Sequence, residues 1–325
     1  VPRGLPVPED FSRDTVEVVR PADGQFLSRT LWLSLDPYLR NVMKGHPLYG
    51  LQLKPGDPMY GETVSQVVES RHAGFAVGDY VLVKNGWQEY GLSDGQGVRK
   101  IDPAVAPLST ALGVLGMPGL TGYAGLVYLG EPRPGETVVV SAATGPVGST
   151  AGQVARILGA RVVGIAGSNE KCDYAVRELG FDACVNYRGG DLRALLKQAC
   201  PNGIDVYFDN VGGDVLAAVL GNLALNARIV LCGMIEAYSA ESPPPGPFLG
   251  PVVAARATMR GLVVYDHLQR LPEMQSKIAG WIRDGRFTYR EDVTEGLEHA
   301  PEAFCRLMRG ENFGKALVRV VPDAP

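Results

Sequence analysis

Residues 138–153 read Val-Val-Val-Ser-Ala-Ala-Thr-Gly-Pro-Val-Gly-Ser-Thr-Ala-Gly-Gln. A β-branched run turns here through small residues into a pattern typical of a helix. A dinucleotide pyrophosphate needs a strand that delivers it, a turn without bulky side chains, and a helix N-terminus whose N–H groups face the phosphates. Ala143, Gly145 and Gly148 meet these needs. Because Ala143 replaces the first glycine of the Gly-x-Gly-x-x-Gly pattern, the motif alone is weak evidence for dinucleotide binding. The stretch predicts a dinucleotide-binding turn.

A second apolar strand, Arg161 to Gly167, ends where a Rossmann fold reads the ribose 2′ position. An NAD site would have Asp or Glu at this point, whereas this chain has Ser168 and Lys171. A hydroxyl and a cation suit a 2′-phosphate, so we expect NADPH. The alternative is that Glu170 binds the ribose and Lys171 is an ordinary solvated lysine.

Strands and helices alternate from about Leu112 onward. The expected strands are Val138 to Ser141, Arg161 to Ile165, Ala183 to Tyr187, Asp205 to Phe208, Arg228 to Cys232 and Gly261 to Val264. Helix-length stretches between them are Ser149 to Leu158, Glu170 to Leu179, Leu192 to Ala199 and Val215 to Leu223. Such alternation predicts a doubly wound parallel sheet, and six strands make a complete dinucleotide-binding sheet.

The residues before this region form short β-type runs separated by Gly and Pro. These runs are Thr15 to Val19, Leu31 to Leu35, Thr63 to Glu69, Tyr80 to Val83 and Trp87 to Leu92. The tail adds helices at Pro272 to Arg283 and Pro301 to Met308 and strands at Tyr289 to Val293 and Ala316 to Val321. We therefore expect a mostly β domain of residues 1–112 plus 288–325, into which a nucleotide-binding domain of residues 113–287 is inserted, with the active site in the cleft between them.

Composition bounds the function. The chain has 325 residues, 46% of them hydrophobic and 20% charged, with a net charge of −4. This charge favours neither nucleic acid nor an anionic membrane as a partner. We expect a cytoplasmic enzyme, because no run of 18 apolar residues and no signal-peptide pattern is present and the five cysteines are odd in number and widely spaced.

Metal-binding patterns are missing from the sequence. The four histidines, His46, His72, His267 and His299, form no His-x₃-His or His-Glu-x-x-His motif, and no Cys-x₂-Cys pair occurs. We expect no metal site.

Four longer stretches carry a family resemblance. They are Leu33 to Arg40 (Leu-Ser-Leu-Asp-Pro-Tyr-Leu-Arg), Gly116 to Thr121 (Gly-Met-Pro-Gly-Leu-Thr), Phe208 to Gly213 (Phe-Asp-Asn-Val-Gly-Gly) and Gly310 to Lys315 (Gly-Glu-Asn-Phe-Gly-Lys). The chain resembles the zinc-independent alkenal/one double-bond reductases of the medium-chain dehydrogenase/reductase superfamily, which include prostaglandin and curcumin reductases. The resemblance implies a Rossmann domain inserted into a GroES-like catalytic domain and a homodimer. It agrees with the missing metal motifs, because Asp36-Pro37-Tyr38 and Gly61-Glu62 stand where zinc-dependent relatives carry a ligand Cys and Gly-His-Glu.

The resemblance also implies cofactor contacts. The turn Ala143, Gly145, Pro146, Val147 and Gly148 would take the pyrophosphate. Lys171 and Tyr187, beside Ser168, would hold the 2′-phosphate, and Asn210 would contact the ribose region. The nicotinamide half would be lined by Cys232, Gly233, Met234, Tyr238, Leu262, Val263, Val264 and Asn312. Pro146 departs from the small residue usual in this turn; it lacks an N–H but is compatible with the first turn of a helix.

The expected reaction is NADPH-dependent reduction of the C=C bond of α,β-unsaturated aldehydes or ketones, with hydride reaching the β-carbon. The candidate catalytic residues are Tyr265, as hydrogen-bond donor to the substrate carbonyl, and Tyr238. Tyr49 and Tyr60 are further substrate candidates, and a half-buried structural tyrosine is the alternative reading of Tyr265. An NADPH quinone oxidoreductase and a non-catalytic NADPH-binding protein are the alternative functions.

Overall fold

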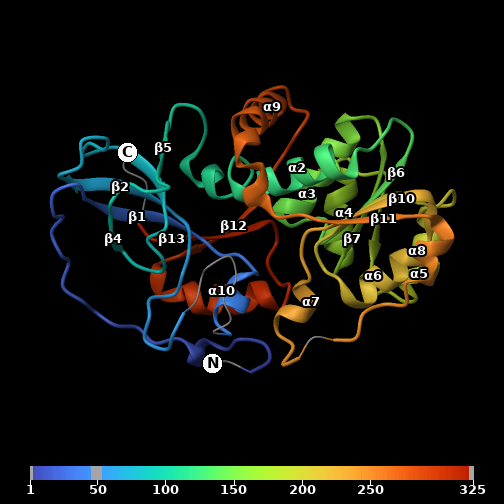
Figure 1. Ribbon diagram of the computed structural model, residues 1–325, viewed down its shortest axis with the longest axis horizontal. Helices are drawn as coiled ribbons and strands as arrows, with labels where there is room; N and C mark the ends of the chain where they lie inside the picture. The colour runs from blue at the N-terminus through green and yellow to red at the C-terminus, as the bar shows by residue number, and fades with distance from the viewer. Residues whose placement is uncertain (1–2, 45–52, 243, 322–325) are drawn as a thin grey trace. The chain divides into compact units, whose positions relative to one another are not determined.

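The computed structural model describes residues 3–44, 53–242 and 244–321. The chain divides into two compact units (Figure 1). Unit 1 comprises Val1–Gly113 and Glu291–Pro325, and unit 2 comprises Val114–Arg290. Each unit has its own sheet.

Unit 1 is built on a seven-stranded sheet. Its strands are β1 (Phe26–Ser34), β2 (Thr63–Ser70), β3 (Tyr80–Val83), β4 (Tyr90–Ser93), β5 (Arg99–Ile101), β12 (Glu291–Glu295) and β13 (Lys315–Arg319). Six of them follow the order β12-β13-β1-β2-β3-β5, with β4 also paired to β1. Two chain-distant segments therefore meet in one sheet, since β13 near the end of the sequence pairs antiparallel with β1 near its beginning.

Short helical segments complete unit 1. They are η1 (Pro8–Asp10), α1 (Leu39–Val42), η2 (Leu108–Leu112), η5 (Leu297–His299) and α10 (Ala300–Met308). Leu31, Trp32, Val64, Leu112 and Leu317 are among the residues of one buried cluster on this sheet.

The expected strand at Thr15 to Val19 is wrong. These residues belong to no ladder, and Val16 and Val19 are 72% and 64% exposed. A β-branched run becomes a strand only where a partner strand is available. Strand β1 already pairs with β2, β4 and β13.

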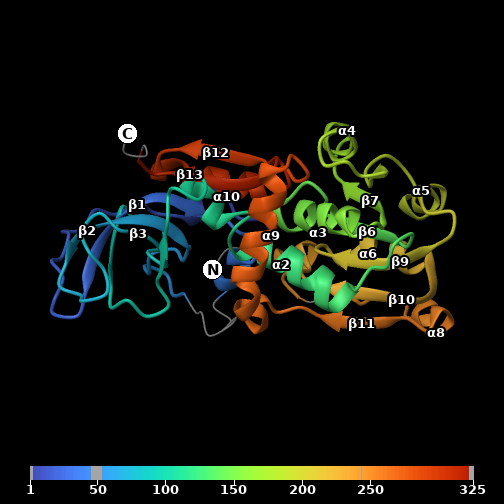
Figure 2. The same ribbon diagram turned by 90° about the horizontal axis from the view of Figure 1, so that it is seen from above.

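Unit 2 contains the predicted parallel sheet (Figure 2). Its strands are β6 (Thr137–Ser141), β7 (Arg161–Ala166), β8 (Ala183–Asn186), β9 (Ile204–Asp209), β10 (Leu223–Leu231) and β11 (Thr258–Gly261), in the order β11-β10-β9-β6-β7-β8. All neighbours pair in parallel. This is the strand order of a complete Rossmann sheet, with its reversal point between β6 and β9.

Helix α2 (Met117–Ala124) and the π-helical η3 (Gly125–Gly130) precede the first strand of unit 2, and the other helices follow its strands. These are α3 (Pro146–Ile157), α4 (Asn169–Arg177), α5 (Leu192–Ala199), α6 (Gly213–Leu220), α7 (Ile235–Tyr238), α8 (Gly250–Ala255), the 3-10 segment η4 (Val264–Arg270) and α9 (Leu271–Arg283). The predicted βα alternation is confirmed.

Two expected strands in unit 2 have wrong bounds. The sixth strand is Thr258–Gly261 instead of Gly261 to Val264, because these four residues pair with Arg228 to Leu231 of β10. The fifth strand begins at Leu223, which the sequence analysis assigned to the preceding helix.

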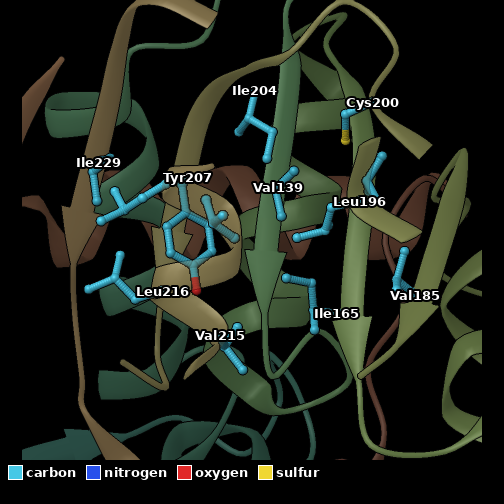
Figure 3. Packing of buried hydrophobic residues seen from close by; sticks show 13 residues of the cluster. Val139, Ile165, Val185, Leu196, Cys200, Ile204, Tyr207, Val215, Leu216 and Ile229 are labelled. Atoms are coloured by element: carbon cyan, nitrogen blue, oxygen red, sulfur yellow. The ribbon is translucent and has the colours of Figure 1, made fainter. Parts of the chain in front are cut away.

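A hydrophobic core on one face of the unit 2 sheet holds its strands and helices together (Figure 3). Val139 and Tyr207 from neighbouring strands are fully buried and pack with Leu196 of α5 and Leu216 of α6. A nearly continuous apolar strand such as β6 fits a parallel sheet, which is buried on both faces. Burial of each such side chain contributes about 1.5–3 kcal/mol.

Candidate functional site: a dinucleotide-binding edge of the parallel sheet

The turn after β6 has a strained backbone and no room for a side chain at Gly148. Ala142 has a φ of 50°, in the left-handed region that non-glycine residues rarely adopt. Its carbonyl oxygen accepts from the Gly145 N–H at 3.0 Å. A Cβ placed on Gly148 would lie 2.4 Å from that same oxygen. Gly148 therefore has to be glycine, and the strained Ala142, which the sequence analysis did not single out, shapes the turn.

The N-terminus of α3 opens at this turn. Gly145 is the N-cap residue and Pro146 occupies the first helical position. The first helical hydrogen bond is donated by Ser149 to Gly145 O at 2.8 Å. The backbone N–H groups of Val147 and Gly148 precede that bond, so they lie at the electropositive end of the helix, where a phosphate binds. Pro146 contributes no N–H.

Hydroxyl and cationic side chains follow β7 and β8. Ser168 is the N-cap residue of α4, and its Oγ accepts from the Lys171 N–H at 3.2 Å. A Cβ on Gly167 would lie 3.2 Å from the Tyr187 hydroxyl, so the tyrosine ring passes over Gly167. Tyr187 therefore lies next to Ser168, which directly follows Gly167 in the chain.

Arg188 adds a cation that the sequence analysis missed. Its guanidinium lies 5.4 Å from the centre of the Tyr187 ring, and the basic residue directly after Tyr187 was the available signal. Glu170, the alternative ribose ligand, is exposed on the first turn of α4. The chemistry of this donor set fits a 2′-phosphate.

A buried carboxylate organises the reversal point of the sheet. Asp209 is fully buried at the end of β9. Its Oδ1 accepts from the Ser141 and Tyr207 hydroxyls at 3.2 and 2.8 Å and from the N–H groups of Val211 and Gly212 at 2.9 and 3.0 Å. Burial, reinforced by the Asp209 charge, raises the pKa of Tyr207 far above its ordinary value. Tyr207 therefore keeps its proton as a donor to Asp209.

Asn210 joins this cluster. Its side-chain Nδ2 donates to Ser141 O at 2.8 Å, and its backbone N–H donates to Ser141 Oγ, also at 2.8 Å. The predicted ribose ligand thus ties the ends of β6 and β9 together. The sequence analysis identified Asn210 from its motif and missed Ser141 and Asp209.

The segment after β10 folds back over the same cluster. The N–H groups of Cys232 and Gly233 donate to Asp209 O at 2.8 and 3.1 Å. Burial, together with the Asp209 charge, raises the pKa of the Cys232 thiol to about 12. The Cys232 thiol therefore stays protonated near neutral pH.

Tyr238 caps this segment. The Met234 N–H donates to its hydroxyl oxygen at 3.4 Å, and a Cβ on Gly233 would lie 3.2 Å from that oxygen. The half-buried phenol thus lies over the Cys232–Met234 backbone.

Leu262 and Val263 connect β11 to η4, and Val264 and Tyr265 are the first two residues of η4. Leu262 is 6% exposed, and its N–H donates to Leu231 O at 2.9 Å. A Cβ on Gly125 would lie 2.6 Å from the Leu262 side chain, so the glycine makes room for it. Tyr265 is 38% exposed.

The remaining site candidates belong to unit 1. The Asn312 side chain donates to Gly314 O at 2.9 Å. Burial, with the Glu62 and Asp36 charges, raises the pKa of Tyr60 to about 12, so its hydroxyl stays protonated. Tyr49 lies outside the described residues.

The described residues contain no group of three or more His, Cys, Asp or Glu side chains that could hold a metal ion. Within the same ranges, no helix is long and apolar enough to cross a membrane.

Comparisons with known proteins cover nearly the whole chain. Residues 1–101 match the family model described as the N-terminal domain of oxidoreductase, and residues 146–280 match the one described as zinc-binding dehydrogenase. The NADPH-dependent curcumin reductase of Escherichia coli is 45% identical over 99% of this chain and 95% of its own length. The NADP(+)-dependent 2-alkenal reductase of Nicotiana tabacum is 41% identical over 98% of this chain and 94% of its own.

A solved structure agrees with these relatives. CurA from Vibrio vulnificus, crystallised in complex with NADPH, is 42% identical, covers 99% of this chain and 97% of its own, and superposes with a TM-score of 0.94. These matches confirm the resemblance drawn from the four sequence stretches and the α/β fold class. The chain belongs to the medium-chain dehydrogenase/reductase family, in the branch that includes curcumin reductase and 2-alkenal reductase.

Proposed function

We propose that this protein reduces the C=C bond of α,β-unsaturated aldehydes and ketones with NADPH. The observation that carries the proposal is similarity above 40% along almost the entire chain to reductases of that kind, one of them solved with NADPH. The glycine-lined turn at the N-terminus of α3 and the hydroxyl and cationic residues after β7 and β8 support this cofactor.

The cofactor would be held along the carboxyl edge of the parallel sheet. The Val147 and Gly148 N–H groups would bind the pyrophosphate, and Ser168, Lys171 and Tyr187 would bind the 2′-phosphate. Asn210, the segments Cys232 to Tyr238 and Leu262 to Val264, and Asn312 would contact the ribose and nicotinamide. When bound, NADPH supplies the hydride.

Two tyrosines would act on the substrate. Arrival of hydride at the β-carbon places negative charge on the carbonyl oxygen, and a positioned donor must stabilise it. The Tyr265 hydroxyl would donate to that oxygen. Tyr238 would be a second donor, because its phenol lies over the Cys232–Met234 backbone, which we expect to line the nicotinamide half. Tyr60 and Tyr49 would contact the remainder of the substrate.

Cofactor-consumption kinetics test the function. Purified protein is offered NADPH or NADH with a medium-chain 2-alkenal, an enone and a simple quinone. We expect NADPH-selective turnover with the saturated aldehyde or ketone as product. Turnover confined to the quinone would assign the chain to quinone reduction instead, and NADPH binding without any turnover would favour a binding protein.

The role of Tyr265 has its own test. Removal of one oxyanion donor commonly lowers kcat about 10²- to 10³-fold. We expect such a loss for Tyr265→Phe and none for Tyr90→Phe, a matched change on β4 of the other sheet. An unchanged kcat and KM in Tyr265→Phe would remove Tyr265 from the mechanism.

A homodimer and a cytoplasmic location complete the proposal. Among the described residues, β10 is the one strand that pairs with β11, and Thr258, Arg260 and Gly261 are exposed. Such an open edge invites a second strand. We expect light scattering to give twice the mass of one chain, and an acidic or proline substitution at Arg260 to yield monomers. The five free cysteines suit a reducing compartment.

A further inference from the structure

Two cysteines lie against each other beneath the expected 2′-phosphate residues. Cys172 stands in the first turn of α4, and Cys184 is the second residue of β8. Helix α4, which carries Cys172, packs against strand β8, and the Cys184 thiol donates a hydrogen bond to the Cys172 sulfur. The absence of a side chain at Gly164 makes this contact feasible, since a Cβ there would lie 3.0 Å from the Cys184 sulfur.

Cys172 has the surroundings of a reactive thiol. It accepts hydrogen bonds from the Cys184 thiol and, more weakly, from the backbone of Ala166, and these lower its pKa, against the opposing effects of burial and Asp173. The start of a helix favours a thiolate in the same way. The same hydrogen bond and burial raise the pKa of Cys184. One thiol is thus predisposed to be the nucleophile and the other to be its proton-bearing partner.

The other three cysteines lack these features. Burial is the largest influence on each, and it raises the pKa of Cys200 and of Cys305 to about 11 and that of Cys232 to about 12. Cys172 is 9% exposed and Cys184 is partly exposed, whereas Cys200 and Cys305 are 2% and 1% exposed; Cys232 is also partly exposed, but its raised pKa keeps its thiol protonated. A small oxidant therefore has a preferred target.

We propose that Cys172 and Cys184 form a peroxide-sensitive disulfide site whose oxidation weakens NADPH binding. The Cys172 thiolate attacks hydrogen peroxide, the O–O bond breaks, and a sulfenic acid and hydroxide form. The Cys184 sulfur then displaces the sulfenic oxygen, so that an S–S bond forms and water leaves. In balance, two thiols and one peroxide give one disulfide and two waters.

The effect on the cofactor follows from position and rests on the proposed function. Lys171 directly precedes Cys172, Ser168 caps the same helix, and Tyr187 follows the strand that carries Cys184. Closing an S–S bond brings the two sulfurs to about 2.05 Å and moves α4 relative to β8. Because the 2′-phosphate would be held by charge-assisted hydrogen bonds, misplacing one donor should raise the Kd for NADPH about ten-fold or more.

Mass spectrometry tests the modification without reference to activity. The reduced protein is treated with stoichiometric hydrogen peroxide, alkylated and digested. We expect the intact mass to fall by two hydrogens and the Cys172 and Cys184 peptides to be linked. In Cys184→Ser we expect a sulfenic acid on Cys172 that dimedone traps, and Cys305→Ser, the matched control, should behave as the wild type. A linkage between other cysteines, or a Cys172 that stays alkylatable, would overturn the proposal.

Fluorescence titration tests the consequence. We expect oxidation to raise the Kd for NADPH and to change that for NADH, which lacks the 2′-phosphate, less than about two-fold. Bound NADPH should slow disulfide formation, because coupling between two sites is reciprocal. A disulfide that leaves the NADPH Kd unchanged would refute the coupling. If the disulfide forms and NADPH affinity falls while no enone is reduced, this inference stands and the proposed reaction fails.

Discussion

Lys315 Nζ donates to Asp36 Oδ1 at 2.8 Å, although 279 positions separate the two residues in the chain. Their side chains are only 3% and 11% exposed. Lys315 also donates to Leu35 O at 2.7 Å, and the Ser34 hydroxyl donates to Asp36 Oδ2 at 2.5 Å. The pair joins the tail strand β13 to the segment that follows β1.

Breaking this pair should destabilise the protein strongly. Asp36→Asn or Lys315→Met leaves one buried charge without its partner, which typically costs about 3–5 kcal/mol. Urea unfolding measures the loss, and the double variant should recover part of it. Asp23→Asn, which removes the exposed partner of Arg71, is the control and should leave the midpoint in place. If either single variant were as stable as the wild type, the Asp36–Lys315 pair would not contribute to the stability of the fold.

Glu62 should make stability depend on pH. Burial, reinforced by the Asp36 charge and opposed by Arg99, Lys84 and Lys315, raises its pKa to about 7. Its unfolded value is near 4.5, so as pH rises between these values the unfolded state loses the proton first and folding becomes less favourable. Glu62→Gln should match the wild type near pH 4.5 and exceed its stability at pH 8, by at most about 3 kcal/mol. If the difference in unfolding free energy between Glu62→Gln and the wild type stayed constant across this pH range, the raised pKa of Glu62 would be contradicted.

Two glycines of the phosphate turn should respond differently to the same change. A Cβ on Gly148 meets Ala142 O at 2.4 Å, whereas one on Gly145 meets it at 3.3 Å. We expect Gly148→Ala to cost about 1–3 kcal/mol of stability and to impair NADPH binding. Gly145→Ala should be the milder variant in both assays, thermal unfolding and NADPH titration. Equal effects would mean that the contact with Ala142 does not shape the site.

Lys171 should decide the choice of cofactor. Lys171→Gln removes the expected cation at the 2′-phosphate, so the Kd for NADPH should rise about ten-fold or more and that for NADH should not change. Lys197→Gln, exposed on α5, is the matched control. If Glu170→Gln weakened NADH and NADPH binding equally while Lys171→Gln did nothing, Glu170 would be the ribose ligand.

Glu273 on α9 joins that helix to Tyr123 of α2 and Tyr128 of η3. Its carboxylate accepts from these two hydroxyls at 2.8 and 2.7 Å and from Lys277 Nζ at 3.0 Å. The Tyr128 bond first, then those of Tyr123 and Lys277, lower the pKa of Glu273 to about 2.

The stabilising effect of Glu273 should therefore disappear in acid. A depressed carboxyl pKa stabilises the fold above the unfolded value near 4.5, and the effect is lost as pH falls toward 2. Because the side chain is 35% exposed, solvent screening keeps the contribution small. We expect Glu273→Gln to melt below the wild type at pH 7 and with it near pH 2.5. A difference in melting temperature that persists at pH 2.5 would assign the effect to packing.

Local patterns were sufficient for the alternating elements of unit 2. Each βα unit is encoded within a few tens of residues, as in the Val138 to Gln153 stretch, where apolar periodicity and the small turn residues act between near neighbours. The same locality explains the errors. Thr15 to Val19 has the composition of a strand but no partner, and the sixth strand is Thr258–Gly261 because these residues pair with Arg228 to Leu231 of β10.

The sequence by itself determined the order of the strands and helices of the parallel sheet, the dinucleotide-binding turn as a candidate, and the family, because these depend on residues close together in the chain. Only the tertiary structure decided the left-handed backbone of Ala142, the Asp209 cluster, the contact of Cys172 with Cys184 and the burial of Lys315 against Asp36. Each of these depends on which elements become neighbours and in what register. Packing of the whole sheet sets those neighbours, so a local pattern of residues does not predict them.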